Sequence, residues 1–147
     1  MLAWEGSCQP QFAALSSFYT ASTGTSWSNS DGWLSGDPCS TGWFGVTCNN
    51  NLVVSLDLKN NNLVGSISES IGNLTGLKIL KLRDNHLAGT IPWEAVVKLQ
   101  GLEIFWLNNN QLSGTIPIEI QTMGNLTEFD ISDNAHSGTL PEFSLFS

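Results

Sequence analysis

Few side chains in this 147-residue sequence could carry out chemistry, and their spacing does not form a reactive site. The two histidines, His86 and His136, have no serine or cysteine at the spacing of a nucleophilic motif. No histidine lies near Cys39 or Cys48, so no group of residues has the spacing of zinc ligands. The glycines form no phosphate-binding motif, and the acidic residues are scattered. The sequence therefore predicts a protein that is not an enzyme and needs neither a metal nor a cofactor.

The cysteines allow two interpretations. Cys39 and Cys48 lie in a short segment rich in glycine and tryptophan, where a local disulfide can form. Closing about ten residues would stabilise the fold by roughly 3 kcal/mol, because it restricts the unfolded chain. Cys8 would then be either free or paired outside the domain. The alternative is three reduced thiols in a cytosolic protein.

Two tripeptides match the acceptor for N-linked glycosylation, at Asn73-Leu74-Thr75 and Asn125-Leu126-Thr127. They fit a secreted or luminal protein, although such tripeptides also arise by chance in a chain rich in Asn and Thr. Residues 1–20 lack the basic start and apolar stretch of a signal peptide, so a secreted form would already have lost its leader. No apolar run approaches the roughly 20 residues that span a bilayer, so we expect no transmembrane segment in this chain.

Composition and charge exclude further classes of protein. The chain has 5 basic and 13 acidic residues, a net charge of −8. A nucleic-acid partner is not expected, because binding one requires positive charge to displace phosphate counterions. Hydrophobic residues make up 41% of the chain, which predicts a folded domain rather than a disordered one. The length corresponds to one domain.

An internal repeat beginning at residue 53 predicts how these residues are positioned. Aligned apolar residues open each copy at Val53, Leu77, Leu102 and Leu126. Two further apolar columns contain Leu56, Leu80, Phe105 and Phe129, and then Leu58, Leu82, Leu107 and Ile131. An asparagine column follows at Asn61, Asn85, Asn110 and Asn134, and a glycine column at Gly65, Gly89, Gly114 and Gly138. Such agreement over four copies indicates a stack of similar structural units.

Each column has a physical reason. The alternation of apolar residues predicts short strands, which stack in parallel about 4.8 Å apart. The amide that follows each strand can bond backbone groups that the turn leaves unpaired, so the four asparagines should form a structural ladder. A third apolar column, Leu74, Leu99 and Met123, closes each coil. No single coil can bury its apolar side alone, so the stack is stable only as a whole.

The motif Leu-Asn-Asn-Asn-Gln-Leu-Ser-Gly-Thr-Ile-Pro (107–117) and its three relatives resemble the leucine-rich-repeat family, in its plant extracellular class. The resemblance implies a right-handed α/β solenoid with short parallel strands on the concave face and an α-helical amino-terminal cap. We expect the cap over 1–52 and repeats over 53–76, 77–101, 102–125 and 126–147. The apolar pattern of the repeat is lost after Pro141, where the last residues include Phe143, Leu145 and Phe146. Either these residues form an irregular cap, or the native chain continues with more coils. We expect that it continues.

Aromatic residues dominate the predicted cap. Pro10 can open a helix, and Phe12, Leu15, Phe18 and Tyr19 then share one helical face. With Trp27, Trp33 and Trp43 they should pack in the core and cover the first edge of the sheet, which would otherwise invite aggregation. At the other end, His136 takes the place of a leucine and should be half exposed; a pH switch there is the alternative interpretation.

Functional residues in such a stack lie on loops and on the outward side of the strands. A predicted ligand-binding face contains Lys59, Ile79, Lys81, Arg83, Ile104, Trp106 and Asn108. Acidic residues (Glu128, Asp130 and Asp133) lie at its far end. Tryptophan is enriched at binding hot spots, and a neighbouring basic group suits a carboxylate or sulfate. The alternatives are that Trp106 only shields Ile79 and Ile104, and that Lys81 pairs with Asp57 or Asp130.

The resemblance implies a non-catalytic extracellular module that recognises a protein, peptide or glycan. A different class is a structural subunit held within a larger extracellular or luminal assembly, which can be membrane-associated. A third hypothesis, ice binding, rests on a column of hydroxyl residues, Ser66, Thr90, Thr115 and Thr139, at strand spacing on another face. Threonine also tolerates extended backbone for its own sake, which is the simpler explanation of that column.

Overall fold

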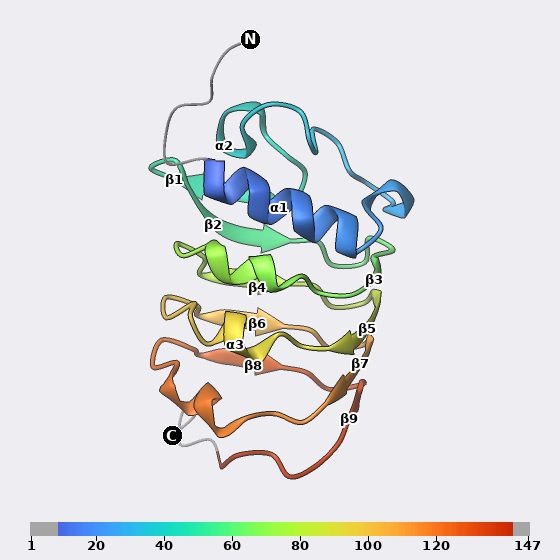
Figure 1. Ribbon diagram of the computed structural model, residues 1–147, viewed down its shortest axis with the longest axis vertical. Coiled ribbons are helices and arrows are strands. Elements are labelled where there is room, and N and C mark those ends of the chain that lie inside the picture. The colour runs from blue at the N-terminus through green and yellow to red at the C-terminus, as the bar shows by residue number, and fades with distance from the viewer. Residues whose placement is uncertain (1–8, 143–147) are drawn as a thin grey trace.

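The computed structural model describes residues 9–142 as a stack of coils with a helical cap at one end (Figure 1). The predictions for Cys8, Phe143, Leu145 and Phe146 lie outside the described residues. Within residues 9–142, no helix is long and apolar enough to cross a membrane. From residue 52 onward, the coils of the structure correspond to the repeats of the sequence.

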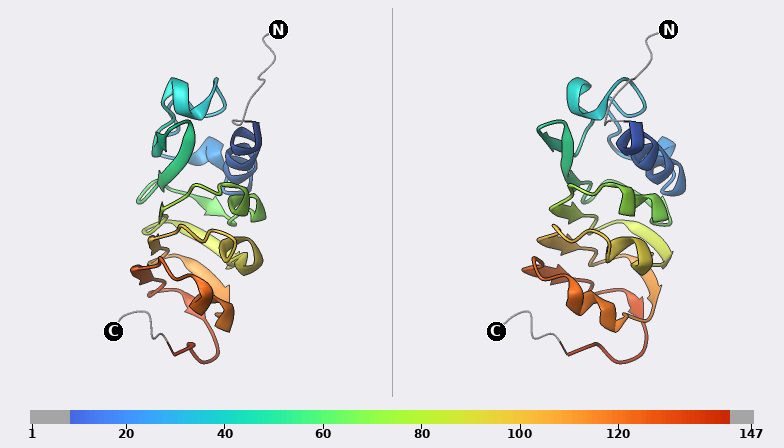
Figure 2. Two further views of the ribbon diagram at one scale, coloured as in Figure 1. Left: turned by 90° about the vertical axis from the view of Figure 1, so that its left-hand side faces the viewer. Right: turned by 60° about the vertical axis from the view of Figure 1, so that its left-hand side comes forward.

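One sheet runs along the whole stack in the order β1-β2-β4-β6-β8, in which β1 (Val46–Asn49) is the antiparallel strand at the first edge. Its parallel strands are β2 (Leu52–Asp57), β4 (Ile79–Lys81), β6 (Ile104–Trp106) and β8 (Glu128–Asp130). Their register places Leu80 beside Leu56 and Phe105, so that equivalent residues of successive repeats are neighbours. The predicted α/β solenoid is confirmed, and Figure 2 shows its coils stacked along the long axis.

The inward side chains form one continuous core. The apolar columns are almost fully buried at Leu56, Leu58, Leu74, Leu80, Leu82, Leu99, Phe105, Leu107 and Met123. Burying each such side chain contributes roughly 1.5–3 kcal/mol. In the last coil Phe129 and Ile131 are half-buried and pack against this core.

Short helical segments form the outer layer, at η2 (Glu69–Asn73), α3 (Trp93–Val96) and η3 (Ile118–Thr122). Pro92 and Pro117 precede two of these segments, and Ser68 takes that place in the first repeat. The Ser68 hydroxyl accepts a hydrogen bond from the Ser70 backbone N–H at 3.2 Å, so it serves as an N-cap. The cap helix α1 (Gln9–Ala21) packs on η2 and continues this layer past the first repeat (Figure 1).

A second parallel sheet, which the sequence analysis did not predict, runs in the order β3-β5-β7-β9. Its strands are β3 (Val64–Gly65), β5 (His86–Thr90), β7 (Gln111–Gly114) and β9 (Ala135–His136). Every glycine of this column has a positive φ, between +79° and +119°, a backbone conformation that residues with a Cβ rarely adopt. At Gly114, whose φ is +90°, a Cβ would also lie 3.0 Å from the Thr90 Cγ2 of the preceding coil.

The asparagine column joins each coil to the one before it. Asn85 is 5% exposed, and its Oδ1 accepts from the backbone N–H groups of Asn61 and Leu63, both at 3.0 Å. Its Nδ2 donates to the carbonyls of Leu58 and Leu82, both at 2.9 Å. Asn110 and Asn134 repeat this pattern one and two coils further along. Each amide thereby satisfies backbone groups that two successive turns leave unpaired.

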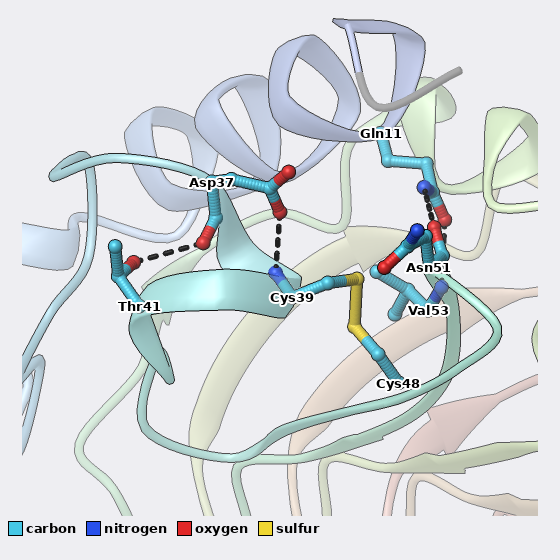
Figure 3. The surroundings of a disulfide bond; sticks show 7 residues. All are labelled: Gln11, Asp37, Cys39, Thr41, Cys48, Asn51 and Val53. Atoms are coloured by element: carbon cyan, nitrogen blue, oxygen red, sulfur yellow. Dashed lines mark hydrogen bonds between the residues drawn. A yellow bond between two sulfur atoms is a disulfide. The ribbon is translucent and has the colours of Figure 1, made fainter. Parts of the chain in front are cut away.

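The amino-terminal cap is fastened to the first repeat by covalent and polar contacts (Figure 3). The predicted disulfide joins Cys39, in α2 (Pro38–Thr41), to Cys48, in β1 (Val46–Asn49). Asp37 accepts from the Cys39 N–H at 2.6 Å and so caps α2. From α1, the Gln11 amide donates to the Asn51 carbonyl at 3.0 Å and accepts from the Val53 N–H at 2.7 Å.

The expectation that aromatic side chains cover the first sheet edge needs correction. Strand β1 covers that edge by pairing antiparallel with β2. Aromatic rings could not do so, because an edge presents backbone N–H and C=O groups that need hydrogen-bonding partners. The aromatic residues instead fill the core of the cap, as also predicted. Trp27, Trp33 and Trp43 are buried, and each indole N–H donates to a backbone carbonyl.

Candidate ligand-binding face

The outward side chains of the parallel strands form a small grid on the concave face. One row contains Asp57, Lys81, Trp106 and Asp130, each in register with the next. The row beside it contains Ser55, Ile79, Ile104 and Glu128. The grid exists because a strand places alternate residues on opposite faces, and the inward ones are taken by the leucine columns. The first row is therefore charged and aromatic, whereas the second row is apolar at its centre.

Trp106 lies at the centre of the grid with two cations on it. The Lys81 Nζ is 4.2 Å from the centroid of the Trp106 ring, and the Arg83 Cζ is 5.0 Å from it. These distances are within the roughly 6 Å over which a ring quadrupole attracts a cation. The indole is half-buried, and its neighbours Ile79 and Ile104 are half-buried too. Part of this apolar surface thus remains accessible beside the two positive groups.

The basic residues of this face do not pair as the alternative interpretation of Lys81 requires. Lys81 forms no ion pair within residues 9–142; its ammonium lies on Trp106 rather than on Asp57 or Asp130. Asp57 is occupied by Lys59, whose Nζ is 3.1 Å from the carboxylate. Within the described residues, the Lys81 ammonium therefore pairs with neither carboxylate that this alternative names, and Asp57 is paired with Lys59.

The predicted face is only partly brought together. Lys81, Arg83 and Trp106 are in direct contact, with Ile79 and Ile104 in the adjoining row. Lys59 is at the edge and turned to Asp57. Arg83 also approaches Asp84, but its Nε is 3.6 Å from the carboxylate, which is longer than a good hydrogen bond. Asn108 follows Trp106 in the chain and is half-buried.

Carboxylates occupy the far side of the grid. Glu128 is exposed and Asp130 is half-buried on β8, and Asp133 is exposed in the following turn. The Asp130 Oδ1 accepts from the Ser132 N–H at 3.0 Å and from its hydroxyl at 2.6 Å. No basic side chain of the described part of the chain pairs with these three carboxylates. The face is thus positive on the side of β4 and negative on the side of β8.

Sequence reasoning missed one residue at the margin of this face. Phe44 is 37% exposed, and with Val46, Thr47, Asp57 and Lys59 it lines a shallow hollow of about 320 Å³. No sequence signal could have revealed it, because Phe44 lies in the turn between α2 and β1, outside the repeat. The cap therefore contributes an aromatic side chain beside the first strand of the grid.

The part of the chain that the structure describes contains no grouping of side chains that resembles a reactive centre. Within the described residues, no three His, Cys, Asp or Glu side chains are grouped so that they could hold a metal ion. His136 is half-buried, as expected, and both of its ring nitrogens are buried without a hydrogen-bond partner. His86 is exposed in another coil. Neither histidine belongs to the grid.

Both glycosylation acceptors are exposed. Asn73 is the last residue of η2, on the outer layer, and Asn125 comes before β8. The Asn125 Nδ2 donates to the Gln100 carbonyl at 2.8 Å. Neither asparagine contributes a side chain to the grid, so glycans there remain compatible with an accessible concave face.

Comparison with known proteins agrees with this architecture. The family model described as Leucine Rich Repeat matches residues 52–74 and 101–123. Phytosulfokine receptor 1 of Arabidopsis thaliana is 39% identical over 118 residues, which cover 76% of this chain and 9% of the receptor. The chain thus spans a small part of the length of the curated relatives it matches.

Two solved structures match a larger share of this chain than phytosulfokine receptor 1 does. A plant ice-binding protein has a TM-score of 0.79 and 32% identity, covering 90% of this chain and 43% of that one. The leucine-rich-repeat ectodomain of the receptor kinase SOBIR1 from Arabidopsis thaliana has a TM-score of 0.73 and 28% identity, covering 89% and 70%. Together with the repeats and the disulfide-bonded cap, these similarities identify the chain as a leucine-rich-repeat protein of the plant extracellular type, with a cysteine-paired amino-terminal cap.

Proposed function

We propose that this protein is a non-catalytic recognition module that binds a short peptide through its concave face. The observation that supports the proposal best is Trp106, a half-buried indole in the middle of an outward row with Lys81 and Arg83 against its ring. Large aromatic groups of this kind carry much of the energy of protein interfaces. The proposal also agrees with the similarity to a plant receptor and to a receptor ectodomain.

The size of the face favours a peptide over a folded protein. Four strands spaced about 4.8 Å apart span roughly 15 Å, and the two outward positions along each strand span less. A standard protein interface buries about 800 Å² on each partner, which is more than the grid offers. An extended peptide needs less area, and the hollow beside Phe44 can lengthen its path onto the cap.

The disulfide supports an extracellular or luminal location. Disulfides persist in oxidising compartments and are rare in the cytosol. The two exposed glycosylation acceptors, Asn73 and Asn125, fit the same location. We therefore propose that recognition takes place outside the cytosol, where a secreted peptide would meet it.

The test removes the indole and measures capture separately from stability. Peptides selected from a displayed seven-residue library on the intact chain serve as the probes. For Trp106→Ala we expect a loss of peptide affinity of about 30-fold, equivalent to roughly 2 kcal/mol, with a thermal midpoint close to that of the wild type. Trp93→Ala is the matched control, because Trp93 is a half-buried indole on the outer layer, against Phe105.

Either of two results would overturn the proposal. Equal loss of affinity in both tryptophan variants would place the binding surface elsewhere. A fall of many degrees in the midpoint of the Trp106 variant would show that the indole is a packing residue. The wild-type affinity and midpoint, measured in the same buffer, are the reference for both.

Ice binding is a second candidate, favoured by the similarity to a plant ice-binding protein and by the hydroxyl column. Ser66, Thr90, Thr115 and Thr139 are all exposed, at equivalent positions of successive coils. The Thr90 and Thr115 methyl groups lie beside Gly114 and Gly138 of the next coil. Inhibition of ice recrystallisation that is lost in Thr90→Lys but kept in Trp106→Ala would favour this function. Absence of inhibition by the wild type would eliminate it.

A further inference from the structure

We propose that the concave face selects its peptide by charge order: an acidic residue over β4, an apolar residue over β6 and a basic residue over β8. The inference rests on the proposed function and specifies the chemistry of its ligand. It comes from the distribution of unpaired charge across the grid, one strand at a time.

The positive side has spare capacity for an anion. Lys81 has no carboxylate partner within residues 9–142, and its ammonium is held 4.2 Å from the Trp106 ring centroid. Arg83 is held by the same ring, and its contact with Asp84 at 3.6 Å leaves most guanidinium donors unused. A carboxylate of a peptide would form charge-assisted hydrogen bonds with both groups.

The carboxylates on the side of β8 would attract a basic group of the ligand. Within residues 9–142, Glu128, Asp130 and Asp133 form no ion pair, and the sequence contains no lysine or arginine between residues 107 and 142. In a chain with a net charge of −8, these carboxylates are not compensated locally. A basic side chain of the ligand would relieve their mutual repulsion, and a second acidic residue would increase it.

The distance between the two sides sets the spacing of the motif. Strands β4 and β8 are separated by β6, so their outward side chains lie two strand spacings apart, about 10 Å. An extended peptide advances about 3.3–3.6 Å per residue, so its acidic and basic residues should be three positions apart. An apolar residue between them would rest on Ile104 and Trp106, at the centre of the grid.

Selection from a displayed seven-residue peptide library on the folded chain tests this order. We expect enriched peptides with an acidic and a basic residue three positions apart and an apolar residue between them. A synthetic peptide with this order should bind at least tenfold more tightly than one with the two charges exchanged. The difference should vanish in 1 M salt, where the Debye length is about 3 Å.

Charge-exchanged variants make the test decisive. Lys81→Glu, Arg83→Glu, Glu128→Lys and Asp130→Lys together keep the net charge and should reverse the preferred order. The milder pair Lys81→Glu with Glu128→Lys should abolish the preference, and it keeps the turn bonds of Asp130 if the fourfold variant does not fold. As a matched control, Glu94→Lys with Lys98→Glu exchanges charges on the outer layer and should retain the original order.

The possible failures are distinguishable. Peptides that lose binding in Trp106→Ala, yet show no charge order or keep it in the exchanged variants, would overturn this inference and leave the proposed function standing. If no peptide depends on Trp106, both the inference and the proposed function are wrong. A control pair that changes the order as much as the concave pairs would also overturn the inference.

Discussion

Individual side chains on the concave face are positioned by competition for partners. Lys59 reaches the Asp57 carboxylate at 3.1 Å, so Lys81 in the next coil finds its neighbour occupied and extends over Trp106 instead. A cation over an aromatic ring contributes roughly 0.5–1 kcal/mol when exposed, which is comparable to a surface ion pair. The competition is therefore close in energy, and the occupied carboxylate decides it.

At the same scale, we expect Asn85→Ala to lower the free energy of unfolding by about 1–3 kcal/mol. The substitution leaves the N–H groups of Asn61 and Leu63 and the carbonyls of Leu58 and Leu82 without their partner in a buried turn. Urea denaturation followed by circular dichroism measures the change. Asn108→Ala is the control, because it removes a half-buried amide whose side chain forms no hydrogen bond to the described part of the chain. Equal stability of Asn85→Ala and the wild type would contradict the account of the asparagine column.

Elements differ in how well the sequence predicts them. Strands β4, β6 and β8 follow from the alternating leucines, because each alternation places one set of side chains in the core. The second sheet could not be predicted in this way. Strands such as β3 and β9 have only two residues, too few for an alternation of apolar and polar residues to be recognised. Strand β1 could not be predicted in this way either, because Val46–Asn49 lies outside the repeat and its pairing depends on the free edge of β2.

The disulfide acts on the cap as an element, and its removal should be measurable there. Cys39→Ser with Cys48→Ser should lower the free energy of unfolding by roughly 3 kcal/mol, because the bond restricts a loop of about ten residues in the unfolded chain. Thermal melts of the wild type with and without reductant should show the same shift. A midpoint that neither treatment changes would show that Gln11 and the aromatic core hold the cap without the disulfide.

The whole molecule behaves as a one-dimensional stack, in which each coil contacts its neighbours. This is why the repeat predicts the core and the rows of the concave face. It does not predict which side chains within a row contact one another. The sequence places Trp106 beside Lys81, but the choice between Trp106 and a carboxylate depends on rotamers and on Asp57. Phe44 was overlooked because it belongs to the cap, where no repeat indicates its direction.

Solution behaviour separates recognition from a structural role at this scale. A free recognition module should be a soluble monomer of 15.9 kDa by light scattering across a range of concentrations. A subunit held in a larger assembly should self-associate or purify with other proteins. Monomeric behaviour together with peptide binding that depends on Trp106 is the result we expect.

The most direct measurement follows the indole N–H signals of the ¹⁵N-labelled protein by NMR during titration with a selected peptide. Trp27, Trp33 and Trp43 donate to backbone carbonyls inside the cap, so their signals should stay in place. If the peptide binds the concave face, the Trp106 signal should show a saturable shift at a stoichiometry of one peptide per chain. A shift of the Trp93 signal with an unchanged Trp106 signal would contradict binding at the concave face, because the ligand would then bind the outer layer.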